Sequence, residues 1–401
     1  MQLWKRNLYA AWVAQLIAII GFNLVFPFIP FYIQELGVTD KAQLARWAGI
    51  LGGIPGLTLA VFSPIWGSLA DRYGRKIMVE RAMFGGAVIV TLMGFATSVH
   101  HLLALRIVQG ALTGTVAAST ALVSTTTPRE RLGLSLGLIQ MAVFSGSSVG
   151  PLIGGVLADF IGYRHSFYVA ATLFLVAGLI VLFWVREGFQ PLPMEETAGK
   201  GLWKDLWMIF SSQQILIMVL FFFLMRFSQR MVGPIFPLFV QFLAKESRHV
   251  ASITGGMLAI TGMMSAISSL IIGGISTRFG YKKVLLVTVM GAAMFYLPQA
   301  FVKDIFQLFL LRVGLGFFIG GITPTANAII GLLVSSKDRG KIYGISASAS
   351  SIGRATGPIV GGMIASFISL RAIFVLAAIL LTVTCTWIGT ALREPGAARK
   401  K

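Results

Sequence analysis

The sequence predicts an all-α membrane protein of twelve transmembrane helices, arranged as two pseudo-symmetric six-helix bundles. Hydrophobic residues make up 56% of the 401 positions and charged residues only 12%, with a mean hydropathy of +0.83. Such a composition is typical of membrane proteins. Apolar runs of about 20 residues, enough to span about 30 Å of hydrocarbon, recur along the chain. The two halves of the chain also repeat their landmarks at one offset.

Each apolar run is expected to be a helix. The runs are continuously apolar, whereas a strand of a membrane β-barrel would alternate over about 10 residues. A helix also satisfies its own backbone hydrogen bonds in lipid. The expected spans are 9–31, 47–69, 79–98, 102–125, 133–158, 165–185, 214–240, 252–275, 284–301, 305–333, 342–367 and 371–392. The first run is of spanning length, so we expect it to act as the insertion signal and to stay on the protein.

The placement of the basic residues predicts the orientation. The net charge of +19 comes from 33 Lys and Arg against 14 Asp and Glu. Most of the basic residues fall in loops on the side of the N-terminus and few in the opposite loops, which is the positive-inside pattern. We therefore expect a multi-pass protein of the cytoplasmic (inner) membrane with both termini in the cytoplasm. The positive net charge then reflects the membrane orientation, and no nucleic-acid partner is expected.

The domain organisation follows from the longest polar stretch, which separates the sixth span from the seventh. It predicts an N-terminal bundle over 1–187, a cytoplasmic linker over 188–212 with a short surface helix at 202–210, and a C-terminal bundle over 213–401. Landmarks recur at an offset of 206 or 207 residues: Pro27 and Pro234, Arg106 and Arg312, Gly146 and Gly353, Pro151 and Pro358. The repetition indicates a duplicated six-helix unit. Parallel repeats of this kind occur in transporters, whose midplane cavity opens to each side in turn.

The loop between spans two and three has a distinctive composition. Its glycines allow a tight reversal at the membrane surface, and its basic residues meet anionic head groups. The residues concerned are Gly67, Asp71, Arg72, Gly74, Arg75 and Lys76. Asp71 has two interpretations. It either sits against the positive N-terminal end of the eleventh span, which starts on the same face, or belongs to a merely solvated charged loop. Thr277 replaces the acid in the second half.

Five arginines lie inside the expected spans, more than three residues from the span ends. A guanidinium near mid-membrane is tolerated only where it is paired or faces water. Arg106 has Gln109 one turn on, and the two are expected to share a face towards a central cavity. Arg226 and Arg230 share a face of span seven, and Arg230 is the equivalent of Asn23 at an offset of 207. Structural pairing is the alternative for Arg106 and Arg230, and for Arg226 the alternative is a side chain that snorkels to the membrane surface. Arg312 and Arg354 complete the set.

These motifs resemble those of the major facilitator superfamily and, within it, the twelve-helix drug:proton antiporter branch of multidrug efflux proteins. The resemblance covers the whole chain. It is carried by the loop Gly67–Lys76, by Arg106-x-x-Gln109-Gly110, by Asn23-x3-Pro27-x2-Pro30 and by the span-five residues Gly146, Gly150, Pro151, Gly154 and Gly155. It implies that Asp71 latches the two halves, that Arg106 takes part in proton coupling, and that the span-five motif governs cavity closure. Close helix packing is the simpler role for those glycines.

The resemblance also implies a substrate cavity between spans one and seven. We expect it to be lined by Asn23, Tyr32, Gln109, Gln140, Arg226, Arg230, Phe236 and Asn327. No acidic residue falls at mid-membrane, so the coupling candidates besides Arg106 are Asp71, Glu35 at the outer end of span one and Asp159 at the outer end of span five. The embedded positive charge favours anionic or neutral amphiphiles over cations.

The expected function is therefore secondary active export of small amphipathic compounds or drugs by proton antiport. Uptake or export of a specific anionic metabolite is the alternative. The expected partners are a small-molecule substrate, protons and membrane lipids, with no metal or cofactor, for a monomeric protein. An integral membrane enzyme or sensor is disfavoured, because the serine-elbow match at 133–137 requires a strand-to-helix turn. The single cysteine, Cys385, excludes an internal disulfide and a thiolate metal cluster.

Overall fold

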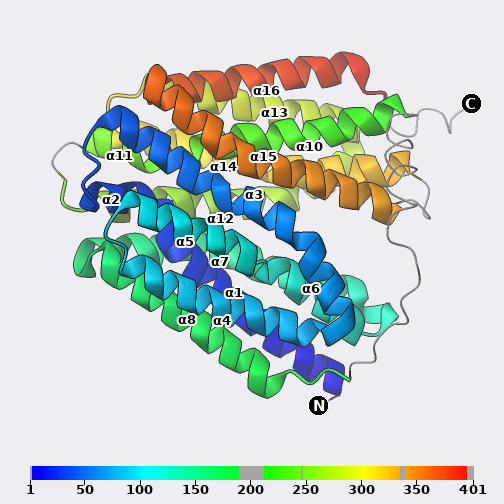
Figure 1. Cartoon of the computed structure of the whole chain (residues 1–401). Coiled ribbons are helices and arrows are strands. Elements are labelled where there is room, and N and C mark those ends of the chain that lie inside the picture. Colours follow the sequence, from blue (N-terminus) through cyan, green and yellow to red (C-terminus); the bar gives the residue numbers. More distant parts are fainter. Residues whose placement is uncertain (1, 189–211, 245–246, 335–338, 395–401) are drawn as a thin grey trace, which may run out of the picture. The chain divides into compact units, whose positions relative to one another are not determined.

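The computed structural model describes residues 2–188, 212–244, 247–334 and 339–394 (Figure 1). Every regular element within these ranges is a helix. Eleven helical segments in the described ranges are long and apolar enough to cross a membrane. These findings confirm the predicted all-α membrane fold. The surface helix predicted at 202–210 lies outside the described residues.

Helices of the first half follow the predicted spans, with interruptions that have local causes. They are α1 Leu3–Val25, η1 Phe26–Phe28, α2 Ile29–Glu35, α3 Lys41–Tyr73, α4 Arg75–Gly94, α5 Val99–Leu112, α6 Thr115–Thr126, η2 Arg129–Arg131, α7 Leu132–Ile161 and α8 Tyr163–Trp184. Pro27 and Pro30 lack the N–H groups that would continue α1, so the first span tightens into a short 3-10 turn before α2. Gly114, with φ +118°, separates α5 from α6.

Helices of the second half repeat this plan. They are α10 Gln213–Val232, α11 Phe236–Ala244, α12 Val250–Phe279, α13 Tyr281–Tyr296, η3 Leu297–Ala300, α14 Ile305–Leu333, α15 Arg339–Phe367 and α16 Ala372–Ala391. The break between α10 and α11 falls where α1 gives way to α2 in the first half. α15 corresponds to the expected eleventh span but is not among the eleven apolar segments, because serines, glycines and Arg354 dilute its apolar residues.

The chain divides into two compact units. The first unit contains Met1–Pro193 and Phe236–Ala259, and the second contains Met194–Ile235 and Ile260–Lys401. α11 and the start of α12 thus belong to the first unit. The bundle boundaries predicted at 187 and 213 remain a prediction.

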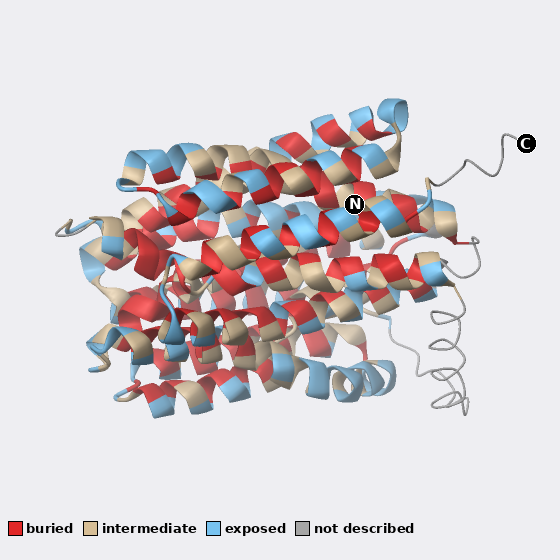
Figure 2. Cartoon of the chain, turned by 90° about the horizontal axis from the view of Figure 1, so that it is seen from above, coloured by how far each residue is buried: buried red, intermediate tan, exposed pale blue. Residues whose placement is uncertain are grey.

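Burial follows the helix faces in both units, as the alternating colours along the ribbons in Figure 2 show. Packed interiors hold large apolar side chains such as Phe167 and Phe174 in the first unit and Phe221 and Phe374 in the second. Outward faces are also apolar, with Leu270 82% exposed. Large apolar side chains left this open fit a protein whose solvent is lipid.

A pair of glutamates shows the duplication at the level of single contacts. The Glu187 carboxylate accepts hydrogen bonds from the backbone N–H groups of Arg75 at 3.1 Å and Lys76 at 2.7 Å. Glu394, 207 residues further on, accepts from the backbone N–H of Lys282 at 3.4 Å. Each glutamate therefore satisfies the free N–H groups at the start of a helix in its own half, α4 and α13.

Two glutamines at equivalent positions of the repeats bond to each other. The Gln34 side chain donates to Gln241 Oε1 at 2.9 Å, and Gln241 donates back to Gln34 Oε1 at 3.1 Å, across 207 residues of sequence. Both residues belong to the first unit, on α2 and α11. The reciprocal bonds place the ends of two equivalent helices side by side.

Candidate functional site

Arg106 is held by the backbone of a neighbouring helix. Its side chain on α5 is only 4% exposed. Nε and Nη2 donate to the carbonyl of Leu51 at 2.9 and 2.6 Å, and Nη1 donates to Gln109 Oε1 at 2.6 Å. Pro55 lies four residues after Leu51 and has no N–H, so the Leu51 carbonyl lacks its helical donor. Arg106 supplies that donor, and its Cζ lies 4.6 Å from the centre of the Phe26 ring.

The neighbours of Arg106 are equally well packed. A Cβ on Gly110 would collide with the backbone of Pro55, so only glycine lets α5 approach α3 this closely. Gln109 is 1% exposed and lies in the interior of the first unit. This arrangement matches the pairing interpretation of Arg106, with the charge held by a carbonyl and an amide of its own unit.

Glycines of the span-five motif pack α7 against α1. A Cβ added at Gly146 would lie 2.8 Å from Ile19 Cγ2, and one at Gly150 would lie 2.7 Å from the Cβ of Asn23. At Gly154 it would collide with the Leu24 carbonyl. Three successive turns of α7 therefore touch α1, and the last contact leaves no room for a methyl group.

A second face of the same motif meets α12. A Cβ at Gly155 would collide with the Ala251 carbonyl, and one at Gly255 would collide with the Pro151 carbonyl. Ala251 and Gly255 lie in the first two turns of α12, within the first unit. The motif residues thus bring together the C-terminal parts of α1 and α7 and the start of α12.

Asp159 lies one turn after Gly155 on α7, and its carboxylate is bound to the start of α12. Its Oδ2 accepts from the backbone N–H of Ser252 at 2.7 Å, and its Oδ1 accepts from that of Ala251 at 3.2 Å. These N–H groups belong to the first turn of α12, where the helix dipole is positive. The carboxylate therefore caps a helix from another part of the chain, which adds about 1 kcal/mol of stability in ordinary N-caps.

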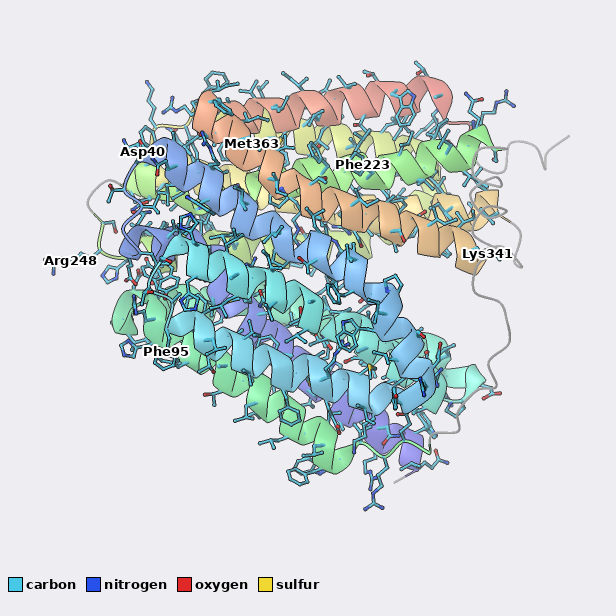
Figure 3. All side chains as sticks on the ribbon, viewed as in Figure 1. Asp40, Phe95, Phe223, Arg248, Lys341 and Met363 are labelled. Atoms are coloured by element: carbon cyan, nitrogen blue, oxygen red, sulfur yellow. The ribbon has the colours of Figure 1, made fainter. Side chains whose placement is uncertain are left out.

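Glu35 and Asp159 line one cavity of about 290 Å³ in the first unit. The wall is completed by Phe31, Gln34, Tyr163, Gln241, Ser247, Arg248 and Val250. Figure 3 shows Arg248 and Asp40 at the same end of this unit, where α3 and α12 begin. Two of the four predicted coupling residues thus share a polar cavity at the expected outer surface. Arg106 and Asp71 do not line it.

The segment Gly67–Lys76, expected as a loop, is helical except for one sharp turn at Gly74, because α3 continues to Tyr73 and α4 begins at Arg75. Gly74 separates α3 from α4 with φ +100°, a conformation that favours glycine. Asp71 is 60% exposed and pairs with Arg75 Nη2 at 2.9 Å, one turn on. Arg72 lies over the Tyr73 ring, 5.4 Å from its centre. The latch with the eleventh span joins residues of different units and remains a prediction.

Arginines of the second unit lie on adjacent helices. Arg226 and Arg230 extend from α10, and Arg354 extends from α15. Arg226 donates to Thr323 Oγ1 at 3.4 Å, and Arg354 donates to Ser351 Oγ at 2.8 Å. Arg312 is buried on α14.

The other expected cavity residues are spread over both units. Tyr32 is buried and donates to the Met93 carbonyl at 2.9 Å, and Phe236 is 1% exposed. Asn23 donates to the Ile19 carbonyl at 2.9 Å. Gln140 is exposed on α7, and Asn327 is partly exposed on α14. Tyr32 and Phe236 therefore belong to packed interiors, and we do not carry them into the proposed site.

Sequence reasoning missed several polar contacts. Gln15, fully buried on α1, accepts from Ser119 Oγ at 2.8 Å and donates to Thr115 Oγ1 at 3.4 Å. Glu187 and Gln34 were not singled out either. The repeat offset is the one signal that finds the last two, because their equivalents are Glu394 and Gln241.

The serine-elbow segment lacks the strand-to-helix turn that this motif requires. Residues 133–137 lie within α7, and Ser135 is fully buried. Among the described residues, no group of three or more His, Cys, Asp or Glu side chains is placed to hold a metal ion. Cys385 is buried on α16, with its thiol 3.4 Å from the Leu286 carbonyl.

Comparison with known proteins agrees with the fold and the motifs. The sequence model of the Major Facilitator Superfamily matches residues 11–297 and 218–401. Among solved structures, a bacterial homolog of the human lysosomal transporter Spinster superposes with a TM-score of 0.80 at 16% identity, covering 98% of this chain and 97% of its own. A D-xylose-proton symporter gives a TM-score of 0.76 at 13% identity, with coverage of 98% and 99%.

Closer relatives are found by sequence. The multidrug resistance protein MdtG of Enterobacter lignolyticus (strain SCF1) is 32% identical over 394 residues, which are 98% of this chain and 94% of the relative. The multi-drug resistance efflux pump PmrA homolog of Lactococcus lactis subsp. lactis (strain IL1403) is 31% identical over 385 residues, with coverage of 96% and 94%. The chain, a multi-pass membrane protein, belongs to the major facilitator superfamily, in the branch that holds these multidrug efflux proteins.

Proposed function

We propose that this protein is a secondary active exporter of small amphipathic compounds, which it exchanges for protons by alternating access. We place it in the inner membrane with both termini in the cytoplasm. Export is supported by the names of the relatives, a multidrug resistance protein and a homolog of a multidrug efflux pump. The positive-inside pattern supports the orientation.

A single observation carries the coupling: the Asp159 carboxylate is bound to the first turn of α12. An ionised carboxylate is a strong acceptor and is attracted to the positive helix end. Protonation removes its charge and converts one oxygen into a donor, which weakens both bonds. A proton taken up from the outer side therefore favours separation of α12 from α7.

Other charged groups around this contact influence how a proton binds there. Glu35, Tyr163 and Arg248 line the cavity next to Asp159, and Arg164 acts on the charge of Glu35. His249 directly precedes α12. Protonation of Glu35 lowers the negative charge of the cavity, while Arg164 favours the ionised form of the Glu35 carboxyl. We propose Glu35 and Asp159 as the proton-accepting pair and Asp71 as a latch on the cytoplasmic side.

Arg106 takes a different part in this proposal. A guanidinium does not titrate in proteins, so it does not carry the proton. It holds the Leu51 carbonyl where Pro55 leaves α3 without a donor. Its part in coupling is then to keep α3 and α5 together while the outer ends move.

The test is substrate flux into inverted membrane vesicles with an imposed pH gradient, acidic inside. Wild-type protein should accumulate an amphipathic substrate only with the gradient. Asp159→Asn should transport at a rate that no longer responds to the gradient, because the side chain is neutral at every pH. Asp40→Asn is the matched control, since Asp40 caps its own helix α3 through Gln43 at 2.8 Å and lies outside the cavity.

Two results would overturn the proposal. Wild-type accumulation that is equal with and without the gradient would remove proton antiport. An Asp159→Asn variant as responsive to the gradient as Asp40→Asn would remove Asp159 from the coupling.

A further inference from the structure

Three arginines of the second unit lie on two adjacent helices, α10 and α15. Arg226 and Arg230 are near the middle of the membrane-crossing segment Gln213–Ala244, and Arg354 is near the middle of α15. α10 and α15 run side by side (Figure 1). Charged side chains at this depth face a partner or water, and they mark substrate or ion pathways in membrane proteins.

The glycines of α15 bring these arginines together. A Cβ on Gly353 would lie 3.3 Å from the Cβ of Arg226, and one on Gly357 would lie 3.3 Å from the Cβ of Arg230. Both glycines also lie against backbone carbonyls of α10. Arg354 follows Gly353 directly, and its charge acts on both arginines of α10. The close packing of two helices therefore gathers three positive charges.

Among the described residues, the hydrogen-bond partners of Arg226 and Arg354 are neutral. Arg226 donates to Gln229 Oε1 at 3.3 Å and to Thr323 Oγ1 at 3.4 Å, and Arg354 donates to Ser351 Oγ. Within the described part of the chain, Arg226, Arg230 and Arg354 form no ion pair, and the pairs Arg75–Asp71 and Lys76–Glu80 lie in the other unit. Three like charges repel one another, so an anion bound among them is strongly favoured.

The cluster is open to a ligand and has an apolar side. Arg230 and Arg354 are exposed, and Arg226 is partly exposed. Phe223 and Phe227 stack with ring centres 5.7 Å apart. Phe223, Arg226, Phe227 and Arg230 have the spacing i, i+3, i+4, i+7, which puts them on one stripe of α10. Figure 3 shows Phe223 on α10 next to α15, with Lys341 and Met363 towards the ends of α15.

We propose that Arg226, Arg230 and Arg354 bind the oxyanion group of an amphipathic substrate, a carboxylate, sulfonate or phosphate, whose apolar part lies on Phe223 and Phe227. Arginine suits this ligand because its planar fork of N–H donors matches the oxygens of an oxyanion. The partly exposed rings of Phe223 and Phe227 supply apolar area beside it. The assignment rests on the proposed function for its role in transport, and it names the substrate class.

Binding to the purified full-length protein in phosphatidylcholine nanodiscs tests this site. The probes are three compounds of one shape: naphthalene-2-carboxylate, the neutral naphthalene-2-carboxamide and the cationic naphthalene-2-carboxamidine. Calorimetry at neutral pH, without any gradient, should show the carboxylate binding at least about tenfold more tightly than the other two. Because no gradient is needed, a failure of proton antiport in vesicles leaves this result intact.

Variants assign the binding to the cluster. Arg230→Gln and Arg354→Gln should each weaken carboxylate binding by about tenfold or more. Arg278→Gln is the matched control, since it removes one positive charge from the exposed end of α12. Arg230→Lys should restore only part of the affinity, because it keeps the charge and loses the fork. The Gln variants should unfold at the same or a higher temperature without ligand, since each relieves repulsion.

Several outcomes would overturn the proposal. Equal binding of carboxylate and amidine would exclude an anion site, as would Gln variants that bind like Arg278→Gln. Inorganic phosphate that binds as tightly as the naphthoate would exclude the apolar contact. Carboxylate binding that disappears when phosphatidylglycerol replaces phosphatidylcholine would assign the cluster to lipid head groups instead of substrate.

Discussion

At the scale of single residues, the backbone N–H that Pro55 lacks explains why the Arg106 guanidinium can be buried. Pro55 leaves the Leu51 carbonyl without its helical donor, and Arg106 donates to it twice. An unpaired buried carbonyl is costly, and so is an unpaired guanidinium. Each group therefore supplies the hydrogen-bond partner that the other lacks. The sequence shows both residues, but it does not show that they meet, because they lie on different helices.

This pairing predicts that Pro55 and Arg106 are energetically coupled. Arg106→Met should lower the free energy of unfolding by about 2–3 kcal/mol, because it leaves Leu51 and Gln109 unpaired. In a Pro55→Ala background the restored N–H takes up the Leu51 carbonyl, and the loss should be smaller by about 1 kcal/mol. The measurement is reversible unfolding in mixed micelles of the four proteins of the cycle. Equal losses in both backgrounds would show that Arg106 is held by something other than this carbonyl.

At the scale of helices, α7 has two packing faces that the spacing of its glycines shows only in part. Gly146, Gly150 and Gly154 share one face by their four-residue spacing, and that face meets α1. Gly155 points elsewhere, to the start of α12. Periodicity therefore predicted a close contact but could not say which helix makes it, since the partner is set by tertiary packing.

Substitutions along α7 should separate packing glycines from neutral ones. Gly154→Ala would press a methyl group into the Leu24 carbonyl and should abolish transport and lower the midpoint of thermal unfolding. Gly137→Ala, in the same helix, has open space around its Cβ. It should keep transport and gain up to about 1 kcal/mol from helix propensity. Flux and thermal unfolding of both variants make the comparison, and a tolerated Gly154→Ala would refute the packing assignment.

At the scale of the whole molecule, duplication was readable from the sequence, and many of the contacts it produces were not. Helix number, spans and the repeat offset all follow from hydropathy and spacing, which are local properties. The cap of Asp159 on α12 and the cluster of Arg226, Arg230 and Arg354 depend on which helices are neighbours. Asp159 was singled out because it is an acid near the membrane, whereas its partners, two backbone N–H groups, carry no sequence signal.

Duplication also predicts that equivalent contacts in the two halves contribute similar amounts to the free energy of unfolding. Glu187→Gln and Glu394→Gln each weaken the acceptor at the start of a helix, α4 or α13, and each should destabilise the protein by about 1 kcal/mol. Glu187→Gln should lose more stability than Glu394→Gln. The reason is that Glu187 accepts two hydrogen bonds, both shorter than the one that Glu394 accepts. The double variant should equal the sum within about 0.5 kcal/mol. Thermal unfolding of the three variants checks this, and a strong departure from additivity would contradict independent caps.

The reciprocal amide pair of Gln34 and Gln241 also records where the chain came from. Positions exchanged by a twofold rotation can touch only near the rotation axis, as in an isologous dimer interface. These two glutamines are such positions, and they touch. In an ancestor with half the present length, the same contact would have joined one glutamine to its own copy in a second molecule. Fusion of two such copies into one chain would keep this self-complementary contact.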